Sequence, residues 1–253
     1  DHLAGETVQT VIDGTAGDNN VTLNASLGMP LAFDGGAGND TLTLGPGVSQ
    51  SFDTDASAMS ASLNLIVDAT ATATFNTAQH LGSLTVNGSA ASAAGGSNTI
   101  VTKALSISGF LDLNNNILIV DYETASPIGT WNGSSYDGLT GMIASGRDGG
   151  AWDGNGLRSS NAASSSGLST LGIGESAEVL QLSSGQTATF AGQTVDDTAV
   201  LIKYTYAGDA NLDGRINGDD YFALDGHVNQ NGSVFGWANG DFNSDGRLNG
   251  DDY

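Results

Sequence analysis

IDGTAGDNNVTL at residues 12–23 and FDGGAGNDTLTL at residues 33–44 are two copies of one segment, aligned without a gap at an offset of 21 residues. In each copy, a turn rich in Gly, Asn and Asp leads into a short run that ends in apolar residues alternating with Thr. A repeat of this length is typical of a solenoid, in which one coil cannot bury its apolar face alone and packs against its neighbours. The two copies therefore predict stacked β-coils near the start of the chain.

The alternating pattern continues to about residue 123, although the repeat itself weakens beyond residue 50. Apolar residues that alternate with polar ones between Gly, Asn and Asp turns are typical of half-buried strands. We expect such strands at residues 7–12, 21–23, 41–44, 63–67, 84–86, 99–101, 111–113 and 117–120. We interpret residues 1–123 as a mainly β, solenoid or parallel β-helix-like region. A β-sandwich with similar strand spacing is the alternative.

Residues 124–207 are less regular, and we expect them to form a β-rich capping region with short helices. Clusters of Ser and Gly surround two candidate helices, at residues 139–145 and 156–163. Strand patterning returns at residues 178–182, 187–190 and 199–206. The last of these, AVLIKYTY, is the most apolar strand of the chain and predicts the final core strand before a boundary near residue 208.

The composition is strongly acidic, with 28 Asp and Glu against six Lys and Arg and a net charge of −22. This balance argues against nucleic acid and anionic membranes as partners, since both attract basic patches. The apolar runs are too short to insert into a bilayer. The chain contains no Cys, which excludes disulfides, thiolate metal sites and Cys nucleophiles. It lacks an initial Met and a signal segment, as expected of a mature or excised chain.

A second repeat lies near the end of the chain. DANLDGRINGDDY at residues 209–221 and DFNSDGRLNGDDY at residues 241–253 are identical at ten of thirteen positions. Each copy has Asp, Asn and Asp at positions 1, 3 and 5, Gly at 6, Asn at 9 and Asp at 12. Oxygen side chains at these spacings converge on one centre around a sharp Gly turn, and hard cations such as Ca²⁺ prefer oxygen ligands. Zinc is disfavoured because it prefers nitrogen and sulfur, and a pair of metal-free Asx turns is the alternative.

The spacing predicts one Ca²⁺ in each loop, with the residue at position 7 binding through its backbone carbonyl. The ligands predicted in the first loop are Asp209, Asn211, Asp213, Arg215, Asn217 and Asp220. Those predicted in the second loop are Asp241, Asn243, Asp245, Arg247, Asn249 and Asp252.

The double loop resembles the repeats of type I dockerins, which share the pattern D-x-N-x-D-G-x-ϕ-N-x-x-D. The resemblance covers residues 209–253 and implies two calcium ions, a small EF-hand-like α-helical module and docking onto a cohesin domain. Gly-Asp pairs at residues 218–219 and 250–251 replace the hydroxyl or small residues that often contact cohesin, and the second hand is expected to be incomplete. The β-rich layout before AVLIKYTYAGDANLDG is also similar to secreted planctomycete surface proteins, which implies an extracellular or cell-surface location.

One further calcium site is suggested within the first repeat. GGAGNDTLT at residues 35–43 resembles the RTX nonapeptide G-G-x-G-x-D-x-ϕ-x. This resemblance implies that Asp40 binds Ca²⁺ together with Gly carbonyls, and Asp18 or Asn19 on the aligned coil could face the same site. A Gly-rich turn at a corner of the solenoid is the alternative interpretation.

The sequence does not predict an enzyme. A lyase of the β-helix type needs a basic residue beside calcium, and none of the four basic residues outside the loops stands in a recognisable motif with paired acids. Asp196 and Asp197 are adjacent, so on a strand they would point to opposite faces, and we expect a turn. The isolated histidines His2, His80 and His227 predict surface or hydrogen-bonded side chains. Trp131, Tyr136 and Trp152 suggest a cap on the end of the solenoid, with a sugar-stacking platform as the alternative.

We therefore expect an extracellular calcium-binding structural protein that assembles with itself, head to tail, into a fibre or surface layer. The segment from Glu6 to Ile12 would donate its strand to a neighbouring copy. A dockerin-bearing module that binds a scaffold cohesin or a carbohydrate is the second hypothesis, and a polysaccharide-active enzyme is the third. Sequons that would permit glycosylation in a host that performs it occur at Asn20, Asn24, Asn39, Asn87, Asn132 and Asn231.

Overall fold

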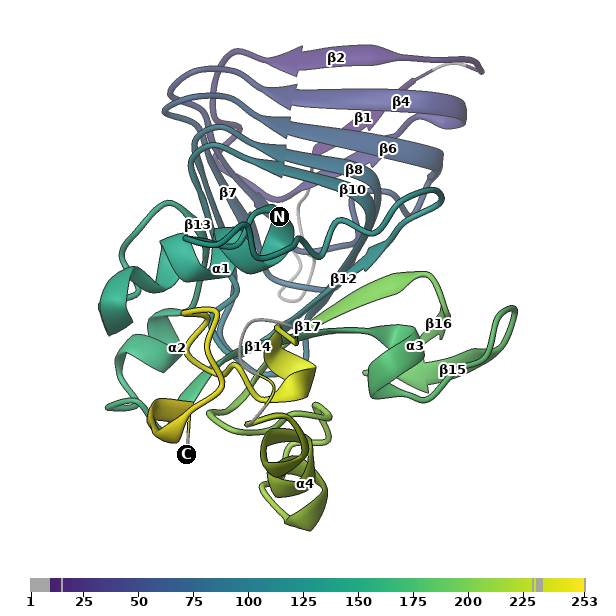
Figure 1. Ribbon diagram of the computed structural model, residues 1–253. Helices are drawn as coiled ribbons and strands as arrows, with labels where there is room; N and C mark the ends of the chain where they lie inside the picture. The colour runs from purple at the N-terminus through teal and green to yellow at the C-terminus, as the bar shows by residue number, and fades with distance from the viewer. Residues whose placement is uncertain (1–9, 15, 229, 231–233, 253) are drawn as a thin grey trace.

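The computed structural model describes residues 10–14, 16–228, 230 and 234–252, and it is mainly β. Its N-terminal part is a β-solenoid of about five turns, in which successive coils stack from β2 towards β12 (Figure 1). The predicted β-solenoid is confirmed, and the β-sandwich alternative is wrong. No helix in the described part of the chain is long and apolar enough to cross a membrane.

Each full coil contributes one strand to a long sheet and one to a short sheet, and consecutive coils pair in parallel. The long sheet has the order β14-β17-β12-β10-β8-β6-β4-β2, in which the strands are β14 (Ser169–Glu175), β17 (Ala199–Tyr206), β12 (Ile117–Asp121), β10 (Thr99–Ile107), β8 (Gln79–Val86), β6 (Ser60–Val67), β4 (Gly36–Leu44) and β2 (Asn20–Leu23). The short sheet has the order β13-β11-β9-β7-β5, with β13 (Gly156–Arg158), β11 (Phe110–Asp112), β9 (Ser89–Ser92), β7 (Thr72–Phe75) and β5 (Ser49–Phe52). Two smaller sheets pair β1 (Thr10–Asp13) with β3 (Leu31–Asp34), and β15 (Thr187–Phe190) with β16 (Gln193–Asp196).

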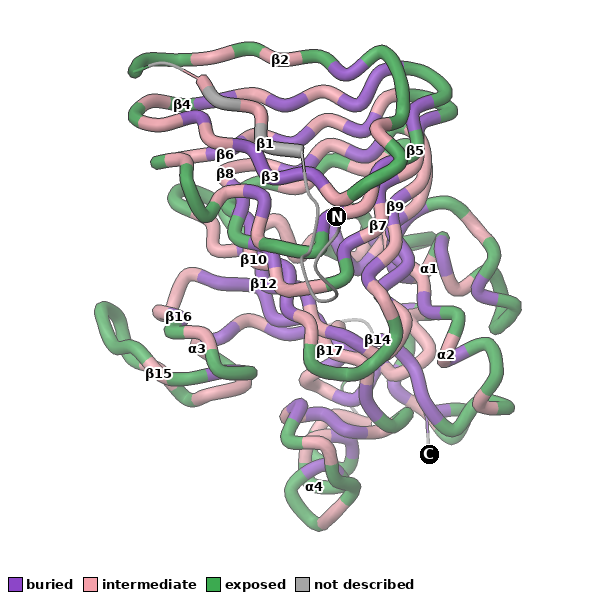
Figure 2. Tube along the Cα trace, turned by 180° about the vertical axis from the view of Figure 1, so that it is seen from behind, coloured by how far each residue is buried: buried purple, intermediate pink, exposed green. Residues whose placement is uncertain are grey.

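The interior of the solenoid consists of columns of apolar side chains that are in register from coil to coil. Leu42 pairs with Leu65, Leu65 with Leu84, and Leu84 with Leu105 along the long sheet. In the short sheet Phe52 pairs with Phe75, and their ring centroids lie 5.6 Å apart. Figure 2 shows the resulting alternation of buried and partly exposed residues along strands such as β4, β6 and β7. Parallel pairing in register therefore lets every coil bury its inward face against the next one.

The last coil is closed by a segment of different topology. After β12 the chain leaves the solenoid, forms α1 (Gly138–Arg147) and the short helix η1 (Asp148–Gly150), and returns as β13 beside β11. We call residues 122–155 the insertion. The most apolar strand, β17, then pairs antiparallel with both β12 and β14 and extends the long sheet. The remaining helices are α2 (Ser160–Ala163), α3 (Ser176–Val179), α4 (Gly218–His227), η2 (Trp237–Asn239) and η3 (Gly250–Asp252).

Two predictions within residues 124–207 are wrong in part. Residues 156–163 form β13 followed by α2 instead of a single helix, and residues 178–182 contain the end of α3 instead of a strand. The strand of this region is β14, which lies before the predicted range and was not expected. Its sequence STLGIGE contains two glycines that weaken the strand pattern. Those glycines make room for neighbours: a Cβ on Gly172 would lie 2.6 Å from Leu212, and one on Gly174 would lie 2.5 Å from Val179.

The segment expected to donate a strand is described only in part. Residues 6–9 lie outside the described residues, while residues 10–13 form β1, which pairs in parallel with β3 of the same chain. At the same end of the solenoid, β2 is the edge strand of the long sheet. This end therefore presents β2 beside the short β1–β3 pair.

His80 connects the solenoid to the β15–β16 hairpin. Its Nδ1 lies 2.6 Å from Oδ2 of Asp55, and its Nε2 lies 2.9 Å from Oε1 of Gln193. Partial burial alone would lower the pKa of His80, but the hydrogen bonds to Gln193 and Asp55, together with the Asp55 charge, outweigh it. The pKa of His80 is therefore raised above its ordinary value of 6.5.

Replacement of one inward side chain tests the columns. We expect Leu84→Ala to lower the free energy of unfolding by about 2–5 kcal/mol, because it leaves a cavity between the coils. Thr85→Ala, on the opposite face of the same strand, serves as the control and should change stability by less than about 1 kcal/mol. Urea denaturation of the two variants measures the difference, and equal losses would contradict the packing described.

The pH dependence of stability tests the His80 contact. Because the folded-state pKa of His80 is raised, its contribution to stability is fully present below the unfolded-state pKa and is lost as pH rises through the folded-state value. Denaturation midpoints should therefore fall over this range in the wild type, and this component should be absent from His80→Gln. An identical pH profile for the two proteins would show that His80 is not responsible.

Candidate metal centre

The second repeat folds into two loops that follow the closing strand of the long sheet. We call residues 209–220 loop 1 and residues 241–252 loop 2. Loop 1 comes directly after β17 and runs into α4, whereas loop 2 follows η2 and ends in η3. In Figure 1 both lie at the end of the molecule opposite β2.

Loop 1 is organised by the carboxylates at its first and last positions. Asp209 accepts hydrogen bonds from the backbone N–H groups of Asp213, at 3.0 Å, and Gly214, at 2.9 Å. Asp220 accepts from the N–H groups of Ala210 and Asn217, both at 2.8 Å. The two carboxylates thus hold the backbone of the loop in a tight turn around them.

Loop 2 repeats this network position by position. Asp241 accepts from the N–H groups of Asp245, at 3.1 Å, and Gly246, at 3.0 Å. Asp252 accepts from those of Phe242 and Asn249, both at 3.0 Å. The two loops are flanked by different elements and pack against different parts of the molecule. Their common hydrogen-bond network therefore reflects their common sequence.

The side chains at positions 3, 5 and 9 each bond to the backbone N–H two residues further along. In loop 1 these contacts are Asn211 to Asp213, Asp213 to Arg215 and Asn217 to Asp219, at 2.8–2.9 Å. Loop 2 contains the same three contacts, made by Asn243, Asp245 and Asn249. Gly214 and Gly246, at position 6, have φ values of 87° and 74°. Glycine adopts this left-handed backbone without a steric cost.

The carboxyl groups at the two ends of each loop are buried. Asp209, Asp220, Asp241 and Asp252 are between 0% and 6% exposed. Burial raises the pKa of Asp209, Asp241 and Asp252, because desolvation disfavours the ionised form. A cation between these groups would offset the desolvation of the carboxylates.

Each loop is also attached by one hydroxyl group to the part of the molecule that precedes loop 1, which we call the body. The hydroxyl of Thr205, on β17, donates to Oδ2 of Asp209. The hydroxyl of Tyr136, in the insertion, donates to Oδ2 of Asp241 at 2.5 Å and accepts from the N–H of Gly236 at 2.8 Å. Burial and the Asp241 carboxylate raise the pKa of Tyr136, so its proton stays in place.

One basic side chain from the body completes each attachment. Lys203, on β17, donates to the carbonyl of Leu212 at 2.6 Å. Arg147, at the end of α1, donates to the carbonyl of Asn243 at 3.0 Å. These four body residues were not predicted as part of the loops, because they lie 4 to 105 residues away along the chain from their partners.

Two aromatic rings fill the space around the loops. The indole N–H of Trp237 donates to the carbonyl of Asp209 at 2.8 Å, and its ring packs edge-on against Phe242 at 4.9 Å. Trp131 packs against Gly246, where a Cβ would lie only 2.3 Å from the indole. Trp237 therefore contacts both loops, and Trp131 packs loop 2 against the insertion.

The donors in these loops suit calcium by their chemistry. Every predicted ligand is an oxygen, from a carboxylate, a side-chain amide or a backbone carbonyl. No group of three or more His, Cys, Asp and Glu side chains in the described part of the chain has an arrangement that could itself hold a metal. A cation in either loop would thus depend on the Asn oxygens and carbonyls as well as the carboxylates.

Asp40 lies inside the solenoid rather than on its surface. It is fully buried, and its Oδ1 accepts from the backbone N–H and the side-chain amide of Asn19, at 3.0 and 3.1 Å. The same amide donates to the carbonyls of Gly17, at 2.6 Å, and Gly35, at 3.0 Å. The Asn19 nitrogen therefore occupies the point at which these three oxygens converge. Asp40 Oδ2 has no hydrogen-bond partner among the residues that the structure describes.

The other singled-out residues lie apart from the loops. Asp196 accepts from the N–H and hydroxyl of Thr198, and Asp197 from the N–H of Gly185. Trp152 is 5% exposed and belongs to the apolar core.

No protein-family model, no curated protein and no solved structure matches this chain. The interpretation of the two loops therefore depends on their own sequence and geometry.

A pair of glycine substitutions tests the seating of loop 2. Gly246→Ala and Gly214→Ala impose the same left-handed strain, but only the first would drive a Cβ into Trp131, since the nearest atom to the second is Lys203 Nζ at 3.4 Å. We expect Gly246→Ala to be the more destabilising by about 1–3 kcal/mol, the usual cost of overpacking. Thermal denaturation compares them, and equal losses would contradict the contact with Trp131.

Removal of the Tyr136 hydroxyl tests the attachment of Asp241. Tyr136→Phe leaves a buried carboxylate with one donor fewer, so we expect a loss of about 1–3 kcal/mol in stability. Tyr206→Phe provides the control because Tyr206 is 53% exposed. Urea denaturation measures the free energy of unfolding of both variants. Equal, small losses of stability in the two variants would contradict the proposed role of the Tyr136 hydroxyl.

Proposed function

We propose that this chain is an extracellular calcium-binding structural protein, in which two Ca²⁺ ions hold the C-terminal end of a β-solenoid together. Each loop would bind one ion through the ligand set that the sequence predicts. The proposal assigns no catalytic step to the chain. One observation carries it: the same network of buried carboxylates occurs twice and is attached both times to the body of the molecule.

The attachments suggest what calcium would do for the solenoid. Thr205 and Lys203 belong to β17, which closes the long sheet, while Tyr136 and Arg147 belong to the insertion. A cation that orders loop 1 would therefore fix β17, and one that orders loop 2 would fix the insertion. Without a cation, clustered acidic groups repel one another, and this repulsion would loosen both contacts.

The proposal includes assembly of copies end to end into a fibre or surface layer. Edge strands offer unpaired backbone groups to another chain, and β2 occupies the edge of the long sheet at the end opposite the loops. Donation of residues 6–12 to a neighbour would require β1 to leave β3, with which it pairs here. Addition of a neighbour's strand to β2 requires no such rearrangement.

Substitution of position 5 tests the calcium sites with little disturbance of the fold. Asp213 and Asp245 are exposed, so the double variant Asp213→Asn/Asp245→Asn removes two charged ligands and keeps an oxygen for the N–H of position 7. We expect calcium affinity to fall about tenfold or more in calorimetric titrations, because affinity depends on the number of charged ligands.

The control carries the same change in charge on the same loops. Asp219 and Asp251, at position 11, are exposed and outside the predicted ligand set, so Asp219→Asn/Asp251→Asn should bind calcium nearly as the wild type does. Wild-type protein that takes up no calcium, or equal losses in the two double variants, would contradict the proposal.

Assembly is tested separately by electron microscopy of the purified protein with calcium and after chelation. Filaments that disappear on chelation would support a calcium-dependent polymer. Single particles under both conditions would remove the assembly part of the proposal and leave the calcium sites to be judged by the titration.

A further inference from the structure

A cleft lies between the insertion, the β14–α3 junction and η2. Its volume is about 300 Å³, within the range of small-ligand sites. The insertion contributes Trp131 and Tyr136, η2 and the residues before it contribute Phe235, and the β14–α3 junction contributes Glu175 and Glu178. The cleft is thus built from three segments that are distant in the sequence.

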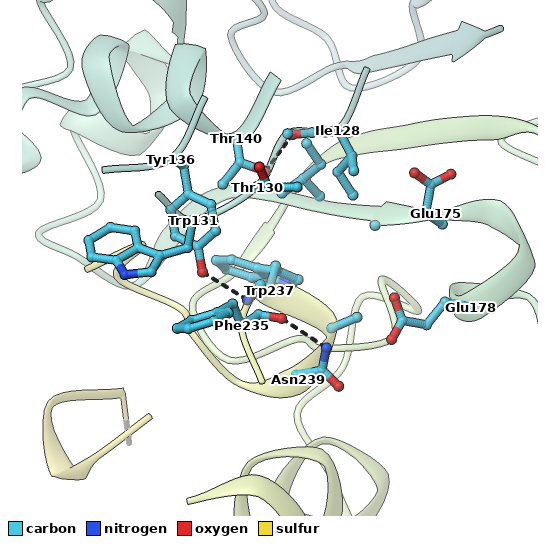
Figure 3. Close-up of a pocket in the computed structure, with 15 residues that line it drawn as sticks. Ile128, Thr130, Trp131, Tyr136, Thr140, Glu175, Glu178, Phe235, Trp237 and Asn239 are labelled. Atoms are coloured by element: carbon cyan, nitrogen blue, oxygen red, sulfur yellow. Dashed lines mark hydrogen bonds between the residues drawn. The ribbon is translucent and has the colours of Figure 1, made fainter. Parts of the chain in front are cut away.

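One end of the cleft is aromatic. The ring centroid of Trp131 lies 5.2 Å from that of Tyr136 and 6.4 Å from that of Phe235. Figure 3 shows these rings grouped together, with Trp237 beside Phe235. Trp131 and Phe235 are only partly buried, so their surfaces are accessible to a ligand.

The other end carries two carboxylates. Figure 3 places Glu175 and Glu178 across the cleft from the rings. Glu175 is held in place by the hydroxyls of Tyr122, at 3.0 Å, and Ser126. Glu178 is exposed, and burial of part of its carboxyl, together with the charge of Glu175, raises its pKa. None of the described residues that line the cleft is Lys, Arg or His, and the one basic group that acts on the charge of Glu178 is His227, which lies outside the lining.

The carboxylates and the aromatic rings together favour a positively charged ligand. Two carboxylates without a basic lining residue repel an anion such as a uronic acid, and they attract a cation. Aromatic rings also attract ammonium groups through their negative faces and cover flat apolar surfaces. A ligand that combines a ring with an ammonium group would satisfy both ends of the cleft.

We propose that this cleft binds an amino sugar residue, with the pyranose ring against Trp131 and Phe235 and the ammonium group at Glu175 and Glu178. A lysine side chain carries the same charge, but its narrow chain has no ring to cover the aromatic wall and would leave much of the cavity unfilled. The proposal rests on the cleft and not on the calcium sites. Because Trp131 and Tyr136 also contact loop 2, the titrations are done both with calcium and after chelation, and binding in either condition supports the sugar site whether or not the loops bind metal.

A tetrasaccharide of glucosamine is the probe, titrated calorimetrically into the full chain at near-neutral pH and fixed salt. Glu178→Gln should lower the affinity about tenfold, the effect of losing one charge-assisted hydrogen bond. Glu123→Gln is the matched control, since it removes the same charge from a residue that pairs with Lys103 and lies outside the cleft. It should leave the affinity within about twofold of wild type.

Two further titrations separate recognition of the sugar from general attraction to an acidic protein. Phe235→Ala should weaken binding while circular dichroism shows an intact fold, and the N-acetylated tetrasaccharide should bind more weakly than the free amine. Equal effects of Glu178→Gln and Glu123→Gln would overturn the proposal, as would undiminished binding of the N-acetylated sugar. A lysine tetrapeptide that bound more tightly than the saccharide, and lost that affinity in Glu178→Gln, would assign the cleft to peptides instead.

Discussion

Each coil of this solenoid can bury its apolar side chains only against the coil before it and the coil after it. The columns that run through Leu65 and Phe75 depend on parallel pairing in register, because a shift by one residue would turn each inward side chain outward. Such an architecture has no natural end, since the last coil leaves its columns and its strand edges uncovered. The rest of the molecule, from the insertion to loop 2, is organised around the closure of that last coil.

The closure uses polar contacts in addition to apolar packing. Leu212 and Trp237 from the C-terminal segment enter the main apolar core, but the loops themselves are held by Thr205, Tyr136, Lys203 and Arg147. Two of the six basic residues of an otherwise acidic chain are thus used on loop carbonyls. Because the loop carboxylates are buried, the stability of this closure depends on whether a cation or a proton neutralises them. A bound cation would therefore couple the order of the loops to the order of the solenoid end.

The sequence predicted the periodic parts of the fold well, because strand pattern and turn chemistry are local properties. The strands of the long sheet within the solenoid were expected, whereas β5, β7 and β9 of the short sheet were missed, since small residues such as Ala73 and Ala90 fill their inward positions. β14 was missed because its two glycines weaken the strand pattern, and one of them, Gly172, makes room for Leu212, which is remote in sequence. Within the loops, spacing alone identified the carboxylates of Asp209 and Asp241. The partners of these groups could not be identified, because no local pattern connects Tyr136 with Asp241.

The central claim is that calcium in the loops fixes the end of the solenoid, and hydrogen exchange of the backbone amides tests it most directly. Exchange should be compared with calcium and after chelation, residue by residue. We expect calcium to slow exchange in β17 and around Tyr136 in the insertion, as well as within loops 1 and 2. Protection confined to residues 209–252, with β17 and the insertion unchanged, would contradict it.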